Sequence, residues 1–167
     1  IIMRKKFLIF FLLSISFTFA QEITGVTKTG DKYSSMIRKS IEGYFKNDFT
    51  VHEEISADDA VFTVNRETFS KDEIKAGFSA HHQLYTNINA PWLFVETTFY
   101  DENNNNQVWT HVWQMWEGTS KRNGEKSSGP VHSSFKWVDG KVVEGIYIYD
   151  TVPLSTEIAA VQKKKKK

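Results

Sequence analysis

Residues 135–150 form the segment that most constrains what this chain can fold into. They read Phe-Lys-Trp-Val-Asp-Gly-Lys-Val-Val-Glu-Gly-Ile-Tyr-Ile-Tyr-Asp, so two runs of aromatic and β-branched residues flank Asp139-Gly140. This dipeptide suits a two-residue type I′ turn, because both central positions of that turn need positive φ. The pattern predicts a β-hairpin. Its second strand ends at Asp150, which puts a carboxylate at the rim of an aromatic surface, a favourable position for pocket chemistry.

The first 20 residues have the pattern of a secretory signal peptide. Three basic residues follow Met3, an apolar run covers 7–17, and the small residues in 18–20 suit a signal peptidase. The apolar run is shorter than the roughly 20 residues that span a bilayer. We therefore expect cleavage before Gln21, a secreted or periplasmic bacterial protein, and no stable membrane span in the mature chain. A retained anchor or a short core helix are the alternatives.

Charge and cysteine content exclude several classes of function. Residues 1–20 hold three of the 21 basic residues, which leaves 18 basic against 20 acidic residues in the mature chain. Five of those 18 are the lysines at 163–167, so the rest carries a net charge of −7. A mildly acidic body argues against nucleic acid as the main partner. The absence of cysteine excludes disulfides, thiol catalysis and cysteine-ligated metals.

Two helices are predicted from periodicity and capping signals. Apolar residues recur at helical spacing over 32–47, which indicates an amphipathic helix. Ser70 and Glu73 form a capping-box pattern, which predicts a helix that runs to about Tyr85.

Shorter elements lie between and after these helices. Thr50 and Glu53 form a second capping-box pattern for a short helix, and 60–64 predicts a short strand. Pro91 should end the helical region, after which the period becomes that of strands. The four predicted strands are 92–100, 108–117, 130–138 and 141–149.

Helices followed by a strand meander predict an α+β fold, with the helices packed on one face of a curved antiparallel sheet. The predicted domain covers 32–158. A flexible segment, 21–31, precedes it, and a lysine-rich tail, 159–167, follows it.

The predicted strand 108–117 carries large residues on both faces. Trp109, Trp113 and Met115 share one side, while Val112 and Trp116 share the other. A half-buried strand should have a polar outer face. Helices can cover only one side of the sheet, so we expect a second subunit to cover the other and form a homodimer. A monomer whose loops fold over that face is the alternative.

The order of elements resembles the SnoaL-like branch of the nuclear transport factor 2-like superfamily. The segments that carry this resemblance are Tyr-Phe-Lys-Asn-Asp-Phe at 44–49, Ala-Asp-Asp-Ala-Val-Phe at 57–62, and the final hairpin with Tyr-Asp-Thr at 149–151. It spans roughly 33–156 and implies a cone-shaped fold whose curved sheet and N-terminal helices enclose a small-molecule pocket, often in a dimer. Family members include polyketide cyclases, isomerases, dehydratases and proteins without catalytic activity, so the fold does not fix the function.

The resemblance and the histidine positions suggest catalytic candidates. Cyclases of this family use a carboxylate and a histidine to move a proton beside a carbonyl, and the family's C-terminal acid falls on Asp150. His81 lies on the apolar stripe of its helix, and His111 shares a strand face with tryptophans. We expect both histidines to face one cavity. In the structural alternative Asp150 begins a polar tail, and the histidines are satisfied core residues.

Further residues are candidates for ligand binding through stacking or hydrogen bonds. The candidates are Trp109, Trp113, Tyr85, Trp137, Tyr147, His132 and Asp59. Asp59 resembles a position where some relatives keep an acidic base, although an acidic turn before a strand explains it better. His52 is expected at the surface. No local histidine spacing fixes a ligand set for a metal and no cofactor motif occurs, so neither is expected.

Two functions follow from these patterns. One is an exported small-molecule-binding domain with an aromatic and histidine-lined pocket, and the sequence favours it. The other is an acid/base enzyme of the isomerase, cyclase or dehydratase type, acting on a small, partly apolar carbonyl compound.

Overall fold

The computed structural model describes residues 22–165, so the predicted signal peptide lies outside the described residues. In chain order the elements are β1 (Gly25–Lys28), α2 (Lys32–Phe45), α3 (Thr50–Ile55), β2 (Ser56–Val64), β3 (Glu67–Ser70), α4 (Lys71–Leu84), β4 (Tyr85–Tyr100), the 3₁₀ helix η2 (Glu102–Asn104), β5 (Val108–Ser120), β6 (Lys126–Val138), β7 (Lys141–Tyr149) and α5 (Val152–Lys165).

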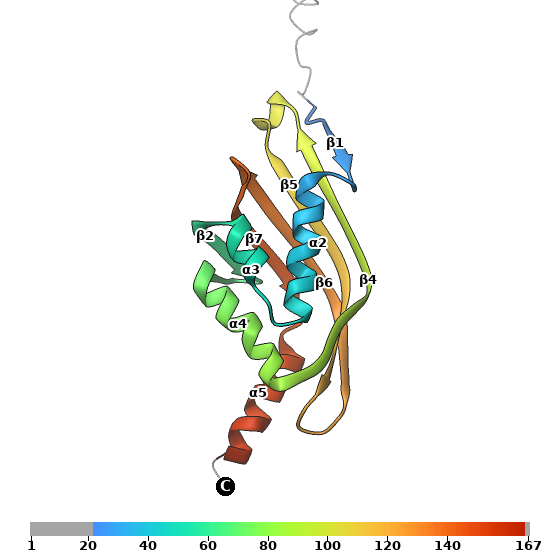
Figure 1. Ribbon diagram of the computed structural model, residues 1–167, viewed down its shortest axis with the longest axis vertical. Coiled ribbons are helices and arrows are strands. Elements are labelled where there is room, and N and C mark those ends of the chain that lie inside the picture. Colours follow the sequence, from blue (N-terminus) through green and yellow to red (C-terminus); the bar gives the residue numbers. More distant parts are fainter. Residues whose placement is uncertain (1–21, 166–167) are drawn as a thin grey trace, which may run out of the picture.

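The seven strands form one curved sheet in the order β1-β4-β5-β6-β7-β2-β3. The predicted meander is present as β4 to β7, and α2, α3 and α4 pack together against one face (Figure 1). The predicted α+β class is confirmed. One detail differs, because β2 and β7 pair in parallel and make the sheet mixed instead of wholly antiparallel.

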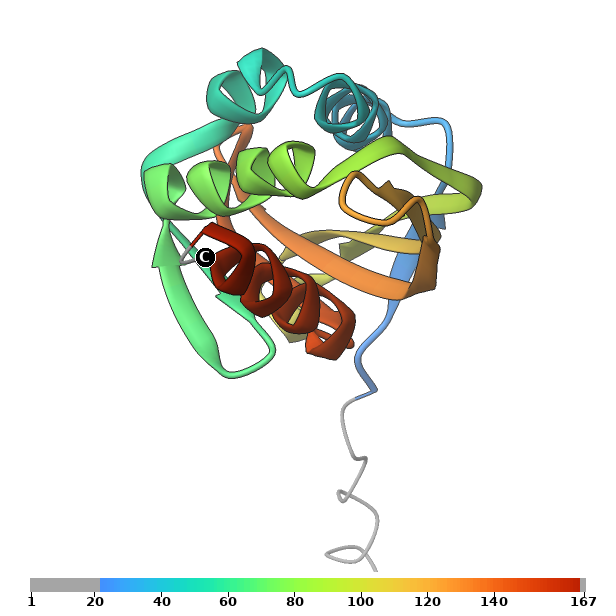
Figure 2. The ribbon, with the colours of Figure 1, turned by 90° about the horizontal axis from the view of Figure 1, so that it is seen from below.

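Figure 2 looks along the long axis from the end where α5 lies. The sheet curves around the helical layer, and α5 crosses this end of the molecule. No helix within residues 22–165 is both long and apolar enough to cross a bilayer.

Local sequence explains how the helices begin. The Asp31 side chain accepts hydrogen bonds from the backbone N–H groups of Tyr33 and Ser34 at the start of α2. The predicted capping box of Ser70 and Glu73 is present at α4.

The capping box predicted at Thr50 is wrong. Asp48 accepts the hydrogen bonds from the Thr50 backbone and hydroxyl, and Glu53 pairs with Lys75 on α4 instead of reaching back to its own helix end. The neighbouring aspartate and a lysine from another helix therefore replace the two predicted contacts.

Strand β5 defines the two faces of the sheet. Thr110 and Val112 are fully buried beneath the helices, whereas Trp113 is 48% exposed. We call the helix-covered face the inner face and the opposite one the outer face. Even-numbered residues of β5 therefore point inward and odd-numbered residues outward, because successive side chains of a strand alternate.

The centre of the core combines apolar packing with a short polar chain. Phe62 is fully buried and lies against Gly145, where a Cβ atom would come within 2.4 Å of the Phe62 ring. Elsewhere in the core, the buried hydroxyls of Ser34, Thr97 and Thr110 are linked by hydrogen bonds of 2.8 Å, and Trp137 Nε1 donates to Thr110 at 2.8 Å. This chain ties α2 to three strands.

Replacing Thr110 with valine should destabilise the fold by about 1–3 kcal/mol. The nearly isosteric side chain removes the acceptor of the buried Trp137 N–H, and it leaves the Thr97 hydroxyl with its hydrogen bond to Ser34 alone. Chemical denaturation of the variant measures this loss. Thr68→Val on the exposed strand β3 is the matched control and should change stability by less than about 0.5 kcal/mol. An equal effect of the two substitutions would contradict the role of the polar chain.

Several boundaries differ from the predictions for identifiable reasons. Part of the predicted flexible segment pairs with β4 as strand β1, a short and fully exposed edge strand without an apolar pattern. Pro91 lies inside β4, where two register shifts flank Asn89 and relax the need for a backbone donor. Residues 118–129, which lie between two of the predicted strands, are mostly strand as well, because β5 runs to Ser120 and β6 begins at Lys126. Helix α5 extends into the predicted lysine-rich tail.

Candidate functional site

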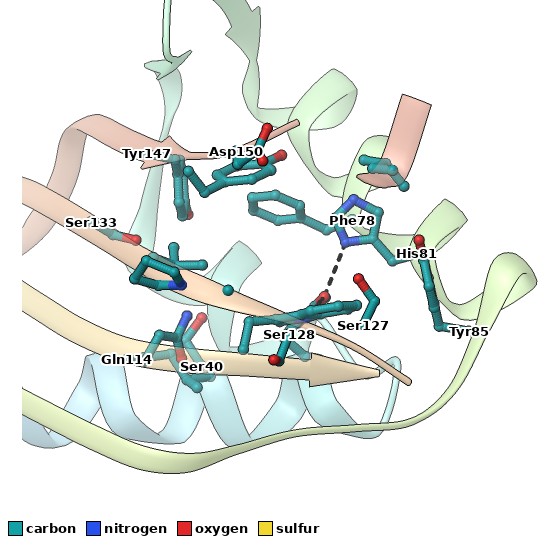
Figure 3. A pocket seen from close by; sticks show the side chains of 18 of the residues that line it. Ser40, Phe78, His81, Tyr85, Gln114, Ser127, Ser128, Ser133, Tyr147 and Asp150 are labelled. Carbon is teal, nitrogen blue, oxygen red and sulfur yellow. Dashed lines mark hydrogen bonds between the residues drawn. The ribbon is translucent and has the colours of Figure 1, made fainter. Parts of the chain in front are cut away.

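A cavity of about 260 Å³ lies between the helices and the inner face of β5, β6 and β7 (Figure 3). Most of its wall is apolar or aromatic. The lining residues are Ile37, Ser40, Ile41, Tyr44, Phe49, His52, Phe78, His81, Tyr85, Gln114, Trp116, Ser127, Ser128, Gly129, Pro130, Val131, Ser133, Phe135, Tyr147, Tyr149, Asp150, Pro153 and Leu154.

The first turn of α5 closes one end of this cavity with Pro153 and Leu154. The helix is anchored through Glu157, which is only 5% exposed and accepts a hydrogen bond of 2.7 Å from Ser120. Arg122 pairs with the same carboxylate at 2.8 Å. The hydrogen bonds from Arg122 hold the pKa of Glu157 below its usual value, so the anchor is ionised at neutral pH.

A three-residue hydrogen-bonded chain crosses the cavity wall. Trp116 Nε1 donates to Tyr44 Oη at 2.9 Å, and Tyr44 Oη lies 3.0 Å from His81 Nδ1. The dashed line at His81 in Figure 3 marks a hydrogen bond of this side chain. Burial raises the pKa of Tyr44 and lowers the pKa of His81 to about 4, so both groups are neutral at pH 7. Because the Tyr44 oxygen already accepts from Trp116, we infer that its proton goes to His81 Nδ1 and that His81 carries its own proton on Nε2.

Two other buried polar atoms of the cavity wall have no hydrogen-bond partner among the described residues. They are Nε2 of His52, a residue only 7% exposed, and Oε1 of Gln114. Burial, and to a smaller extent nearby Lys71, lowers the pKa of His52 to about 4, so this imidazole is also neutral at pH 7. Native proteins rarely leave such atoms unpaired, and a bound molecule would satisfy them.

Asp150 lies at the mouth of the cavity and is exposed to solvent. Its Oδ1 accepts a hydrogen bond of 2.9 Å from the Val152 N–H, so the carboxylate caps the first turn of α5. The exposed position lacks the dry surroundings that make an aspartate an effective base. This position agrees with the alternative in which Asp150 has no catalytic role and begins a polar tail, although its side chain borders the cavity.

The structure brings four of the predicted site residues to the cavity, namely His81, Tyr85, Tyr147 and Asp150. The expectation that His111 shares a cavity with His81 is wrong. His111 lies on the outer face with Trp109 and Trp113. The even-numbered residues of β5 are the ones buried beneath the helices, and successive side chains of a strand alternate between its faces.

The remaining predicted residues also lie away from the cavity. His132 pairs with Trp113 across the strands and shares its outer face. Trp137 is buried in the core beside Tyr33, with ring centroids 4.6 Å apart. Asp59 is exposed on β2 and is not part of the cavity wall.

Sequence reasoning missed four important cavity residues: Tyr44, His52, Gln114 and Trp116. His52 was expected at the surface, but it packs against Phe62 with ring centroids 5.3 Å apart. Gln114 was detectable, because it is a polar residue between the apolar Val112 and Trp116 on the same strand face. A polar side chain in such a row indicates a buried hydrogen-bonding role.

The outer face carries a row of side chains across four strands, and all of them except the half-buried His132 are exposed. Phe94, Trp113, His132 and Ile148 are successive partners in the register of β4, β5, β6 and β7. Trp113 is 48% exposed, Ile148 is 55% exposed, and neighbouring Trp92 is 56% exposed. Next to this row, on the same face of β6, Ser134 Oγ is hydrogen-bonded to both His111 and His132.

Protonation of His52 and His81, the two histidines of the cavity wall, predicts a pH dependence of stability. In the unfolded chain both should titrate near the ordinary value of 6.5, whereas burial lowers their pKa to about 4 in the folded chain. Between these values the unfolded chain binds more protons, so stability falls as the pH falls. We expect a loss of about 2 kcal/mol per histidine between pH 7 and pH 5. Chemical denaturation at the two pH values measures it, and His52→Leu should remove roughly half of the loss. The same pH dependence in the variant would contradict this assignment.

Comparison with known proteins identifies solved structures that share this fold. No family model matches the sequence, and no curated protein matches it. Among solved structures, a candidate polyketide cyclase from Xanthomonas campestris pv. campestris is similar with a TM-score of 0.57 at 12% identity, over 75% of this chain and 95% of its own. A nuclear transport factor 2-like protein from Anabaena variabilis has a TM-score of 0.57 at 14% identity, over 71% and 86% of the two chains. A candidate polyketide cyclase from Pseudomonas putida has a TM-score of 0.56 at 14% identity, over 72% and 93%.

At these identities the likeness establishes the fold alone. The chain has the nuclear transport factor 2-like fold, which confirms the predicted resemblance at the level of architecture.

Proposed function

We propose that this chain, with its nuclear transport factor 2-like fold, is an exported protein that binds a small, largely apolar molecule in the cavity beneath its helices. One observation carries the proposal: an aromatic-walled cavity contains two buried polar atoms, on His52 and Gln114, that have no partner among the described residues. A concave apolar site with a few inward polar groups is the usual form of a small-molecule pocket.

Binding of 2-naphthol, an uncharged two-ring molecule with one hydroxyl, tests this function. Isothermal titration of the mature chain (Gln21 onward) should show one molecule bound per chain. The absence of saturable binding, or binding of many molecules to each chain, would contradict a defined internal site.

The second candidate is an acid/base enzyme acting on a small, partly apolar carbonyl compound. The pair of Tyr44 and His81, 3.0 Å apart in the cavity wall, favours it, because a neutral imidazole can accept a proton and a phenol can donate one. The similarity of the fold to candidate polyketide cyclases also supports this second function. Exchange of the α-protons of 1-tetralone in D₂O, followed by NMR, tests it. An enzyme of this kind should accelerate exchange, and His81→Gln should abolish the acceleration.

Export is the proposal that follows from the first 20 residues, whose pattern is that of a signal peptide. Expression in a bacterial host followed by N-terminal sequencing should yield a processed chain that begins at Gln21 outside the cytoplasm. A chain that keeps its first residues in the cytoplasm would contradict export.

We also propose that two copies associate through their outer faces. The row formed by Phe94, Trp113 and Ile148 is a patch of exposed large apolar side chains, and such patches commonly mark interfaces. A twofold axis would place the same patch of each copy against the other, which suits an isologous dimer.

A further inference from the structure

We infer that the cavity selects an uncharged, ring-bearing molecule whose hydroxyl or N–H group donates a hydrogen bond to Gln114. This inference rests on the proposed function that the cavity binds a small molecule, and it specifies the chemical class of that molecule.

The charges around the cavity support an uncharged ligand. Among the lining residues that the structure describes, none is lysine or arginine, and the acidic Asp150 lies at the exposed mouth. His52 and His81 are neutral at pH 7 because both are buried. A carboxylate or an ammonium group in the interior would lose its water and find no opposite charge, which is strongly unfavourable.

The unpaired polar atoms set the hydrogen-bonding pattern. Gln114 Oε1 is a carbonyl oxygen and can only accept, so it requires a donor from the ligand. Gln114 lies on the inner face of β5, and its side chain borders the cavity together with Ser40 and Ser133 (Figure 3). His52 Nε2 offers a second hydrogen-bonding position in the same wall.

The remaining wall favours a rigid ring system. Phe78 and Tyr147 pack edge to face with ring centroids 4.9 Å apart, and Phe135 meets the same Tyr147 ring edge to face at 5.6 Å. Tyr44 lies 5.7 Å from Phe78. These rings present faces and edges at several angles, which suits an aromatic or alicyclic body.

Three probes with the same two-ring body separate charge from hydrogen bonding. They are 2-naphthol, naphthalene and 2-naphthoate, and their affinities for the mature chain can be measured by titration at pH 7. The hydroxyl should make 2-naphthol bind about tenfold tighter than naphthalene. The ionised carboxylate should make 2-naphthoate bind about 100-fold more weakly than 2-naphthol.

Gln114→Met assigns the hydroxyl preference to its partner. The variant keeps the length of the side chain but removes the acceptor, so 2-naphthol and naphthalene should bind it equally well. Its melting temperature in the absence of probe should stay the same or rise, because an unpaired buried oxygen is removed. Gln83→Met, on the exposed side of α4, is the matched control and should keep the tenfold preference.

The outcomes distinguish this inference from the proposed function. If none of the probes binds, the proposed function itself fails. If 2-naphthol binds but 2-naphthoate binds as tightly, or if folded Gln114→Met keeps the preference for the hydroxyl, the cavity binds small molecules without the selectivity inferred here.

Discussion

Replacing Gly129 with tryptophan is expected to weaken the binding of 2-naphthol by at least about 100-fold, without unfolding the domain. Gly129 lines the cavity and is the cross-strand partner of Trp116, so a side chain at this position shares the inner face with that ring. A Cβ atom at Gly129 meets no other atom within 4 Å, and the backbone there does not need positive φ. The new side chain therefore has room to enter the cavity and take the place of a ligand.

A matched control separates blocking from a general effect of the substitution. A Cβ atom at Gly30 likewise meets no other atom within 4 Å, and the backbone there has an ordinary φ. Gly30 lies in the exposed connection between β1 and α2, away from the cavity wall. Gly30→Trp should therefore bind 2-naphthol like the unmodified protein. Undiminished binding by a folded Gly129→Trp variant would place the ligand outside this cavity.

Trp113→Lys is expected to convert a dimer into a monomer and to raise the dissociation constant by at least about 100-fold, since buried tryptophans are common hot spots of interfaces. Trp113 lies in the middle of the outer-face row, between Phe94 and His132 in the register of the sheet. A lysine there would place like charges from the two copies near one another in an apolar interface, which costs free energy. Sedimentation velocity over a range of concentrations measures the change.

Val26→Lys provides the comparison, because Val26 is 59% exposed on the edge strand β1 and lies outside the row. This variant should remain a dimer. If the unmodified mature chain is monomeric, or if Trp113→Lys dimerises as tightly, the outer face is not the interface between copies.

The sequence predicted the fold well where local chemistry decides the structure. Asp139 and Gly140 adopt positive φ at 50° and 79°, as a type I′ turn requires, and the hairpin pairs as expected. The capping box at Ser70 begins α4. Strand β1 was not predictable in the same way, because its few exposed residues are fixed only by pairing with the edge of β4.

The site was harder to predict because β5 has large side chains on both faces. Alternation separates Trp109, His111 and Trp113 from Val112 and Trp116, but it does not tell which set the helices cover. Three of the predicted site residues lie on the outer face for this reason. Contacts between distant segments decide which face the helices cover. The hydrogen bonds that link Ser34 on α2 through Thr97 to Thr110 on β5 place the even-numbered residues of β5 on the inner face.

Helix α3 illustrates a second limit. Its few residues give too little periodicity to orient His52, which was expected at the surface. Packing against Phe49 and Phe62 turns this side chain into the interior. Only the tertiary arrangement of α3 and β2 therefore reveals that His52 borders the cavity.

Native mass spectrometry of the mature protein purified from its source, before and after denaturation, tests the central claim most directly. We expect each chain to carry one small molecule, and we expect denaturation to release an uncharged, ring-bearing compound with a hydroxyl or N–H group. Chains that carry no bound compound, or that release an ionised one, would contradict it.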